Sequence, residues 1–197
     1  GTKMIPQYLT IHSTANLKST AQNERDWLVN PSNNRVASWH IAVDEKQTVE
    51  AIPLDEVAWH AGNREGNNKS IGIEICESGD RAKTIQNAVE LVAKMLFDRN
   101  WGIDRLRRHF DWSGKNCPRI MSANNWQAWT GFKLSVEREL KKLANGEKSK
   151  IKQEPSNWAK EAWEWGVENG ITDGTNPKGN ITREQVMAMI YRAKKVV

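Results

Sequence analysis

Two short runs of aliphatic and β-branched residues, 7–12 and 70–76, most constrain the fold of this chain. Each is bounded by polar residues and has the length of one buried strand. The clearest helical pattern spans about 84–99, where apolar residues recur every three or four positions. Strands that alternate with helices predict an α/β domain with a central mixed β-sheet flanked by helices.

Shorter patterns fill in the rest of this domain. Residues 39–43 and 48–52 flank a polar stretch and predict a hairpin across the sheet. A helix is expected from about 20 to 29, where a serine and a threonine are available as caps, and another from about 129 or 132 to 143.

The composition changes between residues 145 and 156, which are polar, charged and nearly free of apolar side chains. We interpret 145–156 as a linker between a domain at 1–144 and a small helical unit at 157–197. In this unit an amphipathic helix is expected to end near Gly170, and Thr182 with Gln185 predicts a capping box for a second helix. About 40 residues are marginal for independent stability, so we expect this unit to pack on the main domain or on another copy.

Composition argues against two classes of partner. The chain is 38% hydrophobic with ten tryptophans, as a packed protein would be, yet no apolar run approaches the roughly 20 residues of a membrane helix. The net charge of +5 is dispersed, and the densest basic patch, at 105–108, accompanies no nucleic-acid motif. We therefore expect no membrane span and no nucleic-acid partner.

The two cysteines, Cys76 and Cys117, do not make a disulfide framework. We expect both to be reduced, consistent with cytoplasmic synthesis, and no charged-then-apolar leader pattern is evident. Cys76 follows a buried strand and is expected to be a small core residue.

The stretch from His109 to Cys117 contains two candidate metal ligands. An imidazole and a thiol eight residues apart are ligand types that Zn²⁺ prefers, and Gly114 and Pro118 indicate a loop that folds back on itself. The best third ligand is His12, at the end of the first strand. Two histidines and one cysteine leave a fourth position open, the pattern of a catalytic zinc.

Glu74 is the next candidate. It alternates with Ile73 and Ile75 on a predicted buried strand, where a carboxylate is costly unless paired, so it should face the side that carries His12. The alternative is a salt-bridged sheet residue. Lys115 lies inside the predicted ligand loop, but from the residues alone it could equally be a solvated lysine.

Two histidines and two tryptophans complete the candidates. His60 and Trp59 lie in a loop-like segment that could line a cleft, whereas His40 lies in a strand-like run and is expected to be structural. Trp59 and Trp112 flank suspected site residues, and we expect either to contact sugar or peptide. Most of the remaining tryptophans are expected in the core, whereas the two short helices of 157–197 should expose apolar faces that about 40 residues cannot fully bury.

Five segments, in order, resemble the zinc-dependent N-acetylmuramoyl-L-alanine amidases of the phage-lysin and peptidoglycan-recognition type. The resemblance covers roughly residues 5–142 and rests on 9–14, 38–44, 58–62, 70–75 and 109–118. It implies that His12, His109 and Cys117 hold zinc, that Glu74 performs acid–base chemistry, and that Lys115 stabilises an oxyanion.

The implied activity is hydrolysis of the amide bond between N-acetylmuramic acid and L-alanine in peptidoglycan, as in a phage or prophage endolysin that acts on the bacterial cell wall after release. Three alternatives stay open: a peptidoglycan-binding receptor without activity, an intracellular amidase that recycles muropeptides, and a structural-zinc interaction domain. Residues 157–197 resemble one repeat of the S-layer-homology type. We expect this unit to bind the wall or to make a homo-oligomer.

Overall fold

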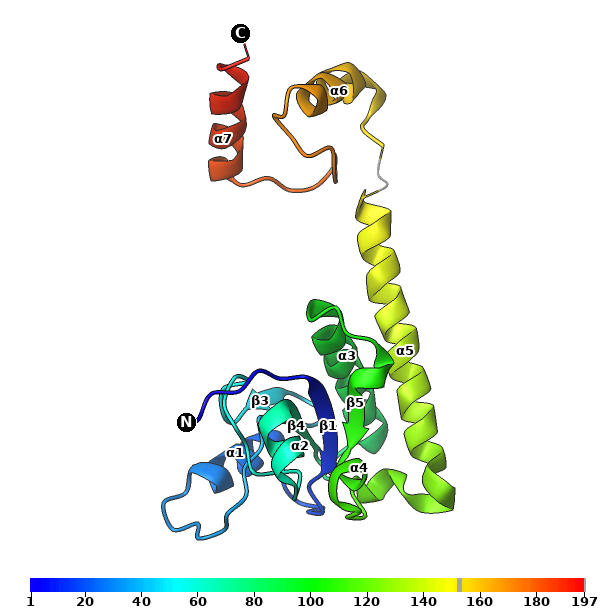
Figure 1. Cartoon of the computed structure of the whole chain (residues 1–197). Helices are drawn as coiled ribbons and strands as arrows, with labels where there is room; N and C mark the ends of the chain where they lie inside the picture. Colours follow the sequence, from blue (N-terminus) through cyan, green and yellow to red (C-terminus); the bar gives the residue numbers. More distant parts are fainter. Residues whose placement is uncertain (152–153, 197) are drawn as a thin grey trace. The chain divides into compact units, whose positions relative to one another are not determined.

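The computed structural model describes residues 1–151 and 154–196, without the side chains of 147–151. The chain divides into two compact units, Gly1–Lys141 and Lys142–Val197. The first unit contains a five-stranded sheet in the order β3-β2-β4-β1-β5 (Figure 1). Its strands are β1 (Tyr8–Ser13), β2 (Ile41–Val43), β3 (Thr48–Glu50), β4 (Ser70–Ile75) and β5 (Leu106–Arg108).

The sheet is mixed, as predicted. β1 pairs in parallel with β4 and with β5, and β2 pairs in parallel with β4. β3 is antiparallel to β2 and forms the predicted hairpin. Asp44 fixes the hairpin turn, because its Oδ1 accepts hydrogen bonds from the backbone N–H groups of Lys46 and Gln47, at 2.7 and 2.8 Å.

The two faces of the sheet differ sharply in character. Alternate residues of β1 and β4, among them Leu9, Ile11, Ile71 and Ile73, are fully buried in the aliphatic core. The helix α3 (Arg81–Asp98) contacts β2 and β4 and buries a matching apolar stripe. The other face carries Thr10, His12 and Glu74, whose side chains point away from this core because strand residues alternate. The sheet therefore separates the core from the functional face.

Most predicted helices are present. α3 matches the predicted 84–99 within a few residues, and α1 (Ala21–Val29) begins after Thr20, whose side chain makes a capping box with Asn23. Two short helices and one strand escaped prediction: α2 (Arg64–Lys69), α4 (His109–Ser113) and β5. Each is too short and too polar to show a hydrophobic period.

The helix α5 (Ala123–Ile151) begins with a left-handed turn at 124–126 and runs beyond the predicted end at residue 143. Trp129, Phe132 and Val136 anchor its first half in the core. The predicted linker at 145–156 thus starts inside this helix, and residues 152–153 lie outside the described part of the chain.

The second unit contains η3 (Asn157–Ala159), α6 (Lys160–Glu168) and α7 (Arg183–Ala193), and Thr182 makes the predicted capping box with Gln185. Of its described residues, only Gly166 and Ile171 are buried. Apolar side chains remain exposed on η3, α6 and α7, as expected from the sequence: Trp158, Trp165, Val167, Val186, Met187, Ile190 and Tyr191.

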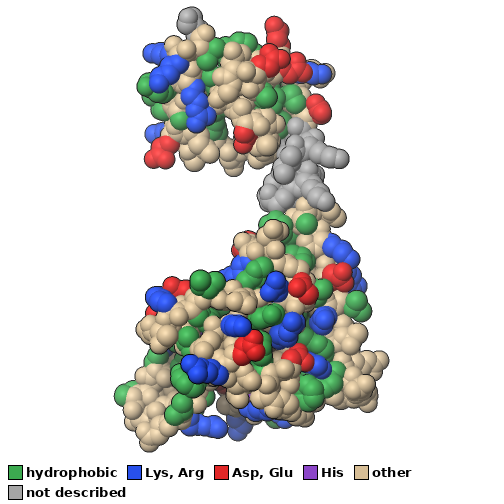
Figure 2. Space-filling view, in the orientation of Figure 1, with side chains coloured by type: hydrophobic (Ala, Val, Ile, Leu, Met, Phe, Trp, Pro, Cys, Tyr) green, Lys and Arg blue, Asp and Glu red, His purple; other side chains and the backbone are tan. Residues whose placement is uncertain are grey.

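Across the described residues, no helix combines the length and the apolar character that crossing a membrane requires. On the face drawn in Figure 2, basic and acidic side chains are interspersed over the first unit. The arginines at 105–108 serve local contacts there: the Arg107 guanidinium lies 4.7 Å from the ring centre of Tyr8, and Arg108 pairs with Asp111 at 2.5 Å.

Candidate active site

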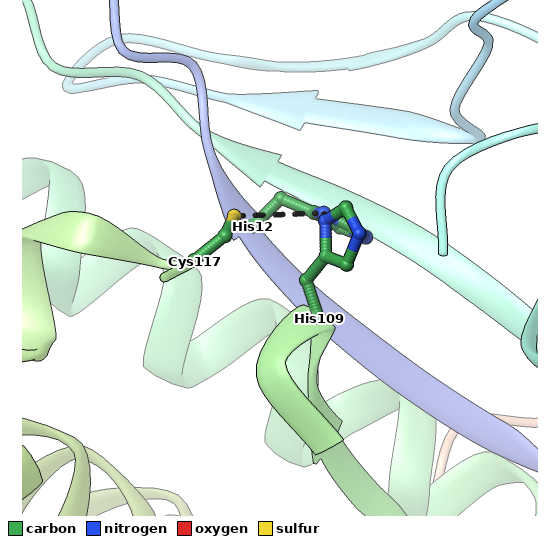
Figure 3. Close-up of side chains that lie close together, drawn as sticks. All are labelled: His12, His109 and Cys117. Carbon is green, nitrogen blue, oxygen red and sulfur yellow. Dashed lines mark hydrogen bonds between the residues drawn. The ribbon is translucent and has the colours of Figure 1, made fainter. Parts of the chain in front are cut away.

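Three side chains with metal-binding atoms converge on the functional face of the sheet (Figure 3). The Nδ1 atoms of His12 and His109 lie 3.0 Å apart, and the Cys117 Sγ lies 3.7 Å from the His12 Nδ1. All three ligand atoms fall within 4.8 Å of one another, and the three residues are buried. Zinc bonds of ordinary length in a tetrahedral site place such atoms about 3.5 Å apart. The donor set and its spacing therefore fit a metal ion.

The fold explains this convergence. His12 lies near the carboxyl end of β1, and His109 follows directly after its neighbour β5. Parallel neighbouring strands end at the same edge of the sheet. The chain then reverses: α4 ends at Gly114, whose φ of 72° is the left-handed conformation that glycine adopts readily, and the Phe110 N–H donates to the Cys117 carbonyl at 3.0 Å. The loop folds back as the sequence predicted.

The protonation states of the two histidines suit metal binding. Burial lowers the pKa of His109 to about 4, reinforced by the charge of Lys115. Burial and the neighbouring histidines lower the pKa of His12 well below its usual value. Both rings are therefore neutral at pH 7, as ligands must be. Burial raises the pKa of the Cys117 thiol to about 12, so a metal would have to displace its proton.

Hydrogen bonds behind the ligands orient both imidazoles. The His12 Nε2 lies 2.9 Å from the His60 Nδ1, and the His60 Nε2 lies 3.1 Å from the Ser70 carbonyl oxygen. Since that carbonyl only accepts, the His60 Nε2 donates to it, the His60 Nδ1 accepts from His12, and the His12 Nδ1 is left with a lone pair for a metal. The backbone of Ala61 makes a hydrogen bond to His109. The adjacent residues His60 and Ala61 thus orient the imidazole rings of both metal ligands.

His60 therefore supports His12 from behind, and it also lines the cleft beside the ligands. Both of its nitrogens are engaged, and burial lowers its pKa to about 3. Its ring packs over Gly72, where a Cβ would come within 2.7 Å of the imidazole. A glycine in a strand signals such a close approach, so this signal was present in the sequence. His40 is structural as expected: its Nδ1 accepts from the Gly72 N–H at 2.8 Å.

Glu74 lies directly opposite His12 in the register of β1 and β4. Its Oε2 is buried and makes no hydrogen bond to any described residue. Burial, with the nearby charge of Glu24, raises the pKa of Glu74 to about 8 despite the opposing charge of Lys115. The carboxyl can thus hold or release a proton near neutral pH.

A cleft of about 290 Å³ gives access to the metal ligands, and Glu74, Lys115, Trp59 and His60 line it. Trp59 is 61% exposed at the cleft, as a residue that contacts a ligand would be. A wider cavity of about 910 Å³ shares the Glu74 wall with this cleft. Two further buried polar atoms without a described partner, Thr14 Oγ1 and Trp39 Nε1, belong to residues that line both.

Trp112 lies elsewhere. Its Nε1 donates to the Thr10 Oγ1 at 2.8 Å, and its ring meets Tyr8 edge to face at 5.5 Å. It does not belong to the lining of either cavity beside the ligands. We therefore assign to Trp112 a role in supporting α4 against β1, in place of the expected substrate contact.

Comparisons with known proteins agree with this geometry. The sequence profile of the N-acetylmuramoyl-L-alanine amidase family matches residues 2–120. The chain is 41% identical over 186 residues to the N-acetylmuramoyl-L-alanine amidase CwlA of Bacillus subtilis, a match that includes 88% of this chain and 66% of CwlA. It thus spans just under two thirds of that relative.

Solved structures share the fold. The catalytic domain of XlyA is 39% identical with a TM-score of 0.63, and the match covers 69% of this chain and 89% of that domain. A mutant endolysin from Bacillus subtilis gives the same identity and TM-score, over 69% of this chain and 88% of the other. The profile match, the identity to CwlA and the shared fold together assign the chain to the N-acetylmuramoyl-L-alanine amidase family.

Proposed function

We propose that this protein is a zinc-dependent amidase that hydrolyses the bond between N-acetylmuramic acid and L-alanine in bacterial peptidoglycan. The observation that carries the proposal is the convergence of His12, His109 and Cys117 beside Glu74 in one cleft, in a chain of this family. Two histidines and a cysteine are the ligand set of a zinc site with an open position.

Zinc in this site would act as a Lewis acid on the scissile carbonyl and would lower the pKa of a bound water to about 7. The protein supplies the rest. Its buried histidines are already neutral, and His60 orients His12 through a hydrogen bond. His60 thereby supports a metal ligand, and because it also lines the cleft we keep it as a proposed substrate contact.

Glu74 is the proposed proton carrier. A group that first accepts a proton from water and then donates it to the leaving amine works best when its pKa lies near the working pH. Burial raises the pKa of Glu74 to about 8 in the absence of a metal, and the charge of a bound zinc ion would lower it toward that pH. Lys115 lines the same cleft and would stabilise the oxyanion. Trp59, at the cleft, and the unpaired Trp39 Nε1 are available to contact the substrate.

We further propose that the protein is an endolysin, synthesised in the cytoplasm and acting at the cell wall after release. The similarity to an endolysin from Bacillus subtilis supports this proposal. In this proposal residues 1–144 catalyse the hydrolysis. Residues 157–197, the S-layer-homology-like unit, bind the wall or a second copy of the chain. The exposed apolar side chains of α6 and α7 support a binding role.

Digestion of purified sacculi tests the activity. Mass spectrometry should detect new free amino groups on L-alanine, chelation should abolish them, and added Zn²⁺ should restore them. Cys117→Ser should be inactive. Full activity in a metal-free preparation would contradict the zinc mechanism, and cleavage of soluble muropeptides but not of sacculi would favour a recycling amidase. Binding of muropeptides without any cleavage would indicate a receptor.

The C-terminal unit needs a separate test. A chain truncated after Ala144 should keep zinc and cleave small muropeptides, but it should lyse intact cells more weakly, because tethering raises the effective concentration at a surface. Sedimentation with sacculi and light scattering of the full chain separate wall binding from self-association. Lysis equal to that of the full chain, together with a monomeric mass, would leave the unit without either role.

A further inference from the structure

Three segments beside the proposed zinc site meet at one carboxylate, that of Glu77. Its Oε1 accepts hydrogen bonds from the Ala15 N–H at 2.9 Å and from the Arg119 Nε at 3.0 Å. Its Oε2 accepts from an Arg119 terminal nitrogen at 2.5 Å. Ala15 follows β1, Glu77 follows β4, and Arg119 follows the loop that carries Cys117. The carboxylate thus joins two strand ends to the ligand loop.

The ion pair is formed by a buried acid and a half-exposed base. The Glu77 side chain is 2% exposed, whereas that of Arg119 is 47% exposed. A buried carboxylate is costly without a cation and hydrogen bonds, so Glu77 requires Arg119 more than Arg119 requires Glu77. Because a guanidinium bound through two nitrogens has a fixed plane, the pairing also fixes where the Arg119 side chain lies.

Arg119 is also tied to β1 through its backbone. Its N–H donates to the Ser13 Oγ at 3.1 Å. Ser13 adjoins the ligand His12, and Arg119 lies two residues after the ligand Cys117. The hydrogen bonds of Arg119 therefore connect the two ligands across a separation of 105 residues, where the Cys117 Sγ lies 3.7 Å from the His12 Nδ1.

We propose that Glu77 and Arg119 are positioning residues that hold the Cys117 loop against β1 and so set the thiolate at bonding distance from the metal. This inference rests on the proposed zinc function. The competing explanation is an ion pair that stabilises the fold without affecting the metal. The two explanations differ in what happens to zinc affinity and to the Cys117 thiol when the pair is broken.

A double-mutant cycle distinguishes them. Zinc affinity would be measured by competition with a chromogenic chelator for the full chain and for Glu77→Gln, Arg119→Met and the double variant. Each single change should weaken zinc binding by about 10- to 100-fold, the usual effect of losing a partner behind a metal ligand. The double variant should be no weaker than the worse single one, since both changes remove one interaction.

Arg81→Gln is the matched control. Arg81 also binds Glu77, but it donates to the Glu77 backbone carbonyl, at 3.1 Å, and not to the carboxylate that holds Arg119. Its zinc affinity should equal that of the parent. If Arg119→Met does not fold, Arg119→Lys keeps the charge, loses the two-nitrogen geometry and should still weaken zinc binding. Unchanged zinc affinity in folded variants, or strictly additive losses, would overturn the proposal.

A second arm does not depend on zinc. In the chelated protein, iodoacetamide should alkylate Cys117 faster in Glu77→Gln and Arg119→Met than in the parent, because loosening the loop exposes a thiol that is now 6% accessible. Peptide mass mapping separates Cys117 from the core residue Cys76. A parent that binds no zinc would refute the proposed function, while equal alkylation rates would refute the positioning role by themselves.

Discussion

Adding zinc to the metal-free protein at pH 6 should release protons whose number identifies the groups at the site. The pKa of Cys117 is raised to about 12, mainly by burial, so its thiol is protonated at pH 6 and must ionise to bind a metal. His109, with a pKa lowered to about 4, is already neutral, as is His12. The ligands together should release about one proton per chain.

Glu74 should add a further fraction of a proton. Its pKa is raised to about 8, so the carboxyl is protonated at pH 6, and a doubly charged ion in the same cleft favours the carboxylate. Because the ion lowers this pKa, the parent protein should release more protons at pH 6 than Glu74→Gln, which should release about one. Cys117→Ser should release about one proton fewer than the parent protein.

Calorimetry in buffers of different ionisation enthalpy measures this number, because the apparent binding enthalpy varies linearly with it. A pH near 6 is chosen so that ionisation of water at the metal, with a pKa near 7, adds little. The reasoning fails if the parent releases no proton, or if Cys117→Ser releases as many as the parent. In either case Cys117 would not be the thiolate ligand.

Further expectations concern single side chains and pH. Glu74→Gln should keep zinc and lose roughly 10²–10⁴-fold in turnover of purified wall, so near-normal turnover would assign the proton to another residue. Lys115→Ala should lose on the order of 10²-fold in kcat with little change in zinc content. His60→Ala should weaken zinc binding by about 10- to 100-fold, measured by chelator competition, while Trp59→Ala should leave it unchanged. The metal-free protein should lose stability in acid: the pKa values of His60 and His109 are lowered to about 3 and about 4, so the native state binds these protons more weakly than the unfolded chain. Below pH 6.5 its free energy of unfolding should fall by roughly 1.4 kcal/mol per pH unit for each of these histidines. The pKa of Glu74 is raised to about 8, so between pH 6.5 and pH 4.5 this carboxyl should offset the fall due to one histidine. Urea denaturation at pH 7 and pH 5 should show this loss, and equal midpoints would contradict it.

The parts of this fold that could be predicted are those with a long hydrophobic pattern. β1, β4 and α3 each bury apolar side chains along their whole length, so their periods are visible in the sequence. β5 has three residues, two of them arginines, and it exists because it pairs with β1. α2 depends on the Asn63 cap and carries no apolar stripe. Such elements are specified by their neighbours rather than by their own sequence.

The same limit applies to the site. His12, His109 and Cys117 could be proposed from ligand chemistry and loop length, and the structure brings them together. The supporting role of His60 could not, because Gly72 signals a close approach without showing that His60 makes it or that its ring meets the His12 nitrogen. Nor could the pairing of Glu77 with Arg119, since residues 42 positions apart reveal no partnership in one sequence.

The parallel register of β1 and β4 makes the length of each strand as important as its composition. His12 faces Glu74 because the two strands are aligned at that pair, and every neighbouring pair follows from the same alignment. Deleting one residue within either strand would turn its imidazole or carboxylate into the aliphatic layer and an isoleucine toward the cleft. A substitution along these strands leaves the alignment of His12 with Glu74 intact, whereas an insertion or deletion would preserve it only in a connecting loop. The length of each strand thus fixes which side chains face the site.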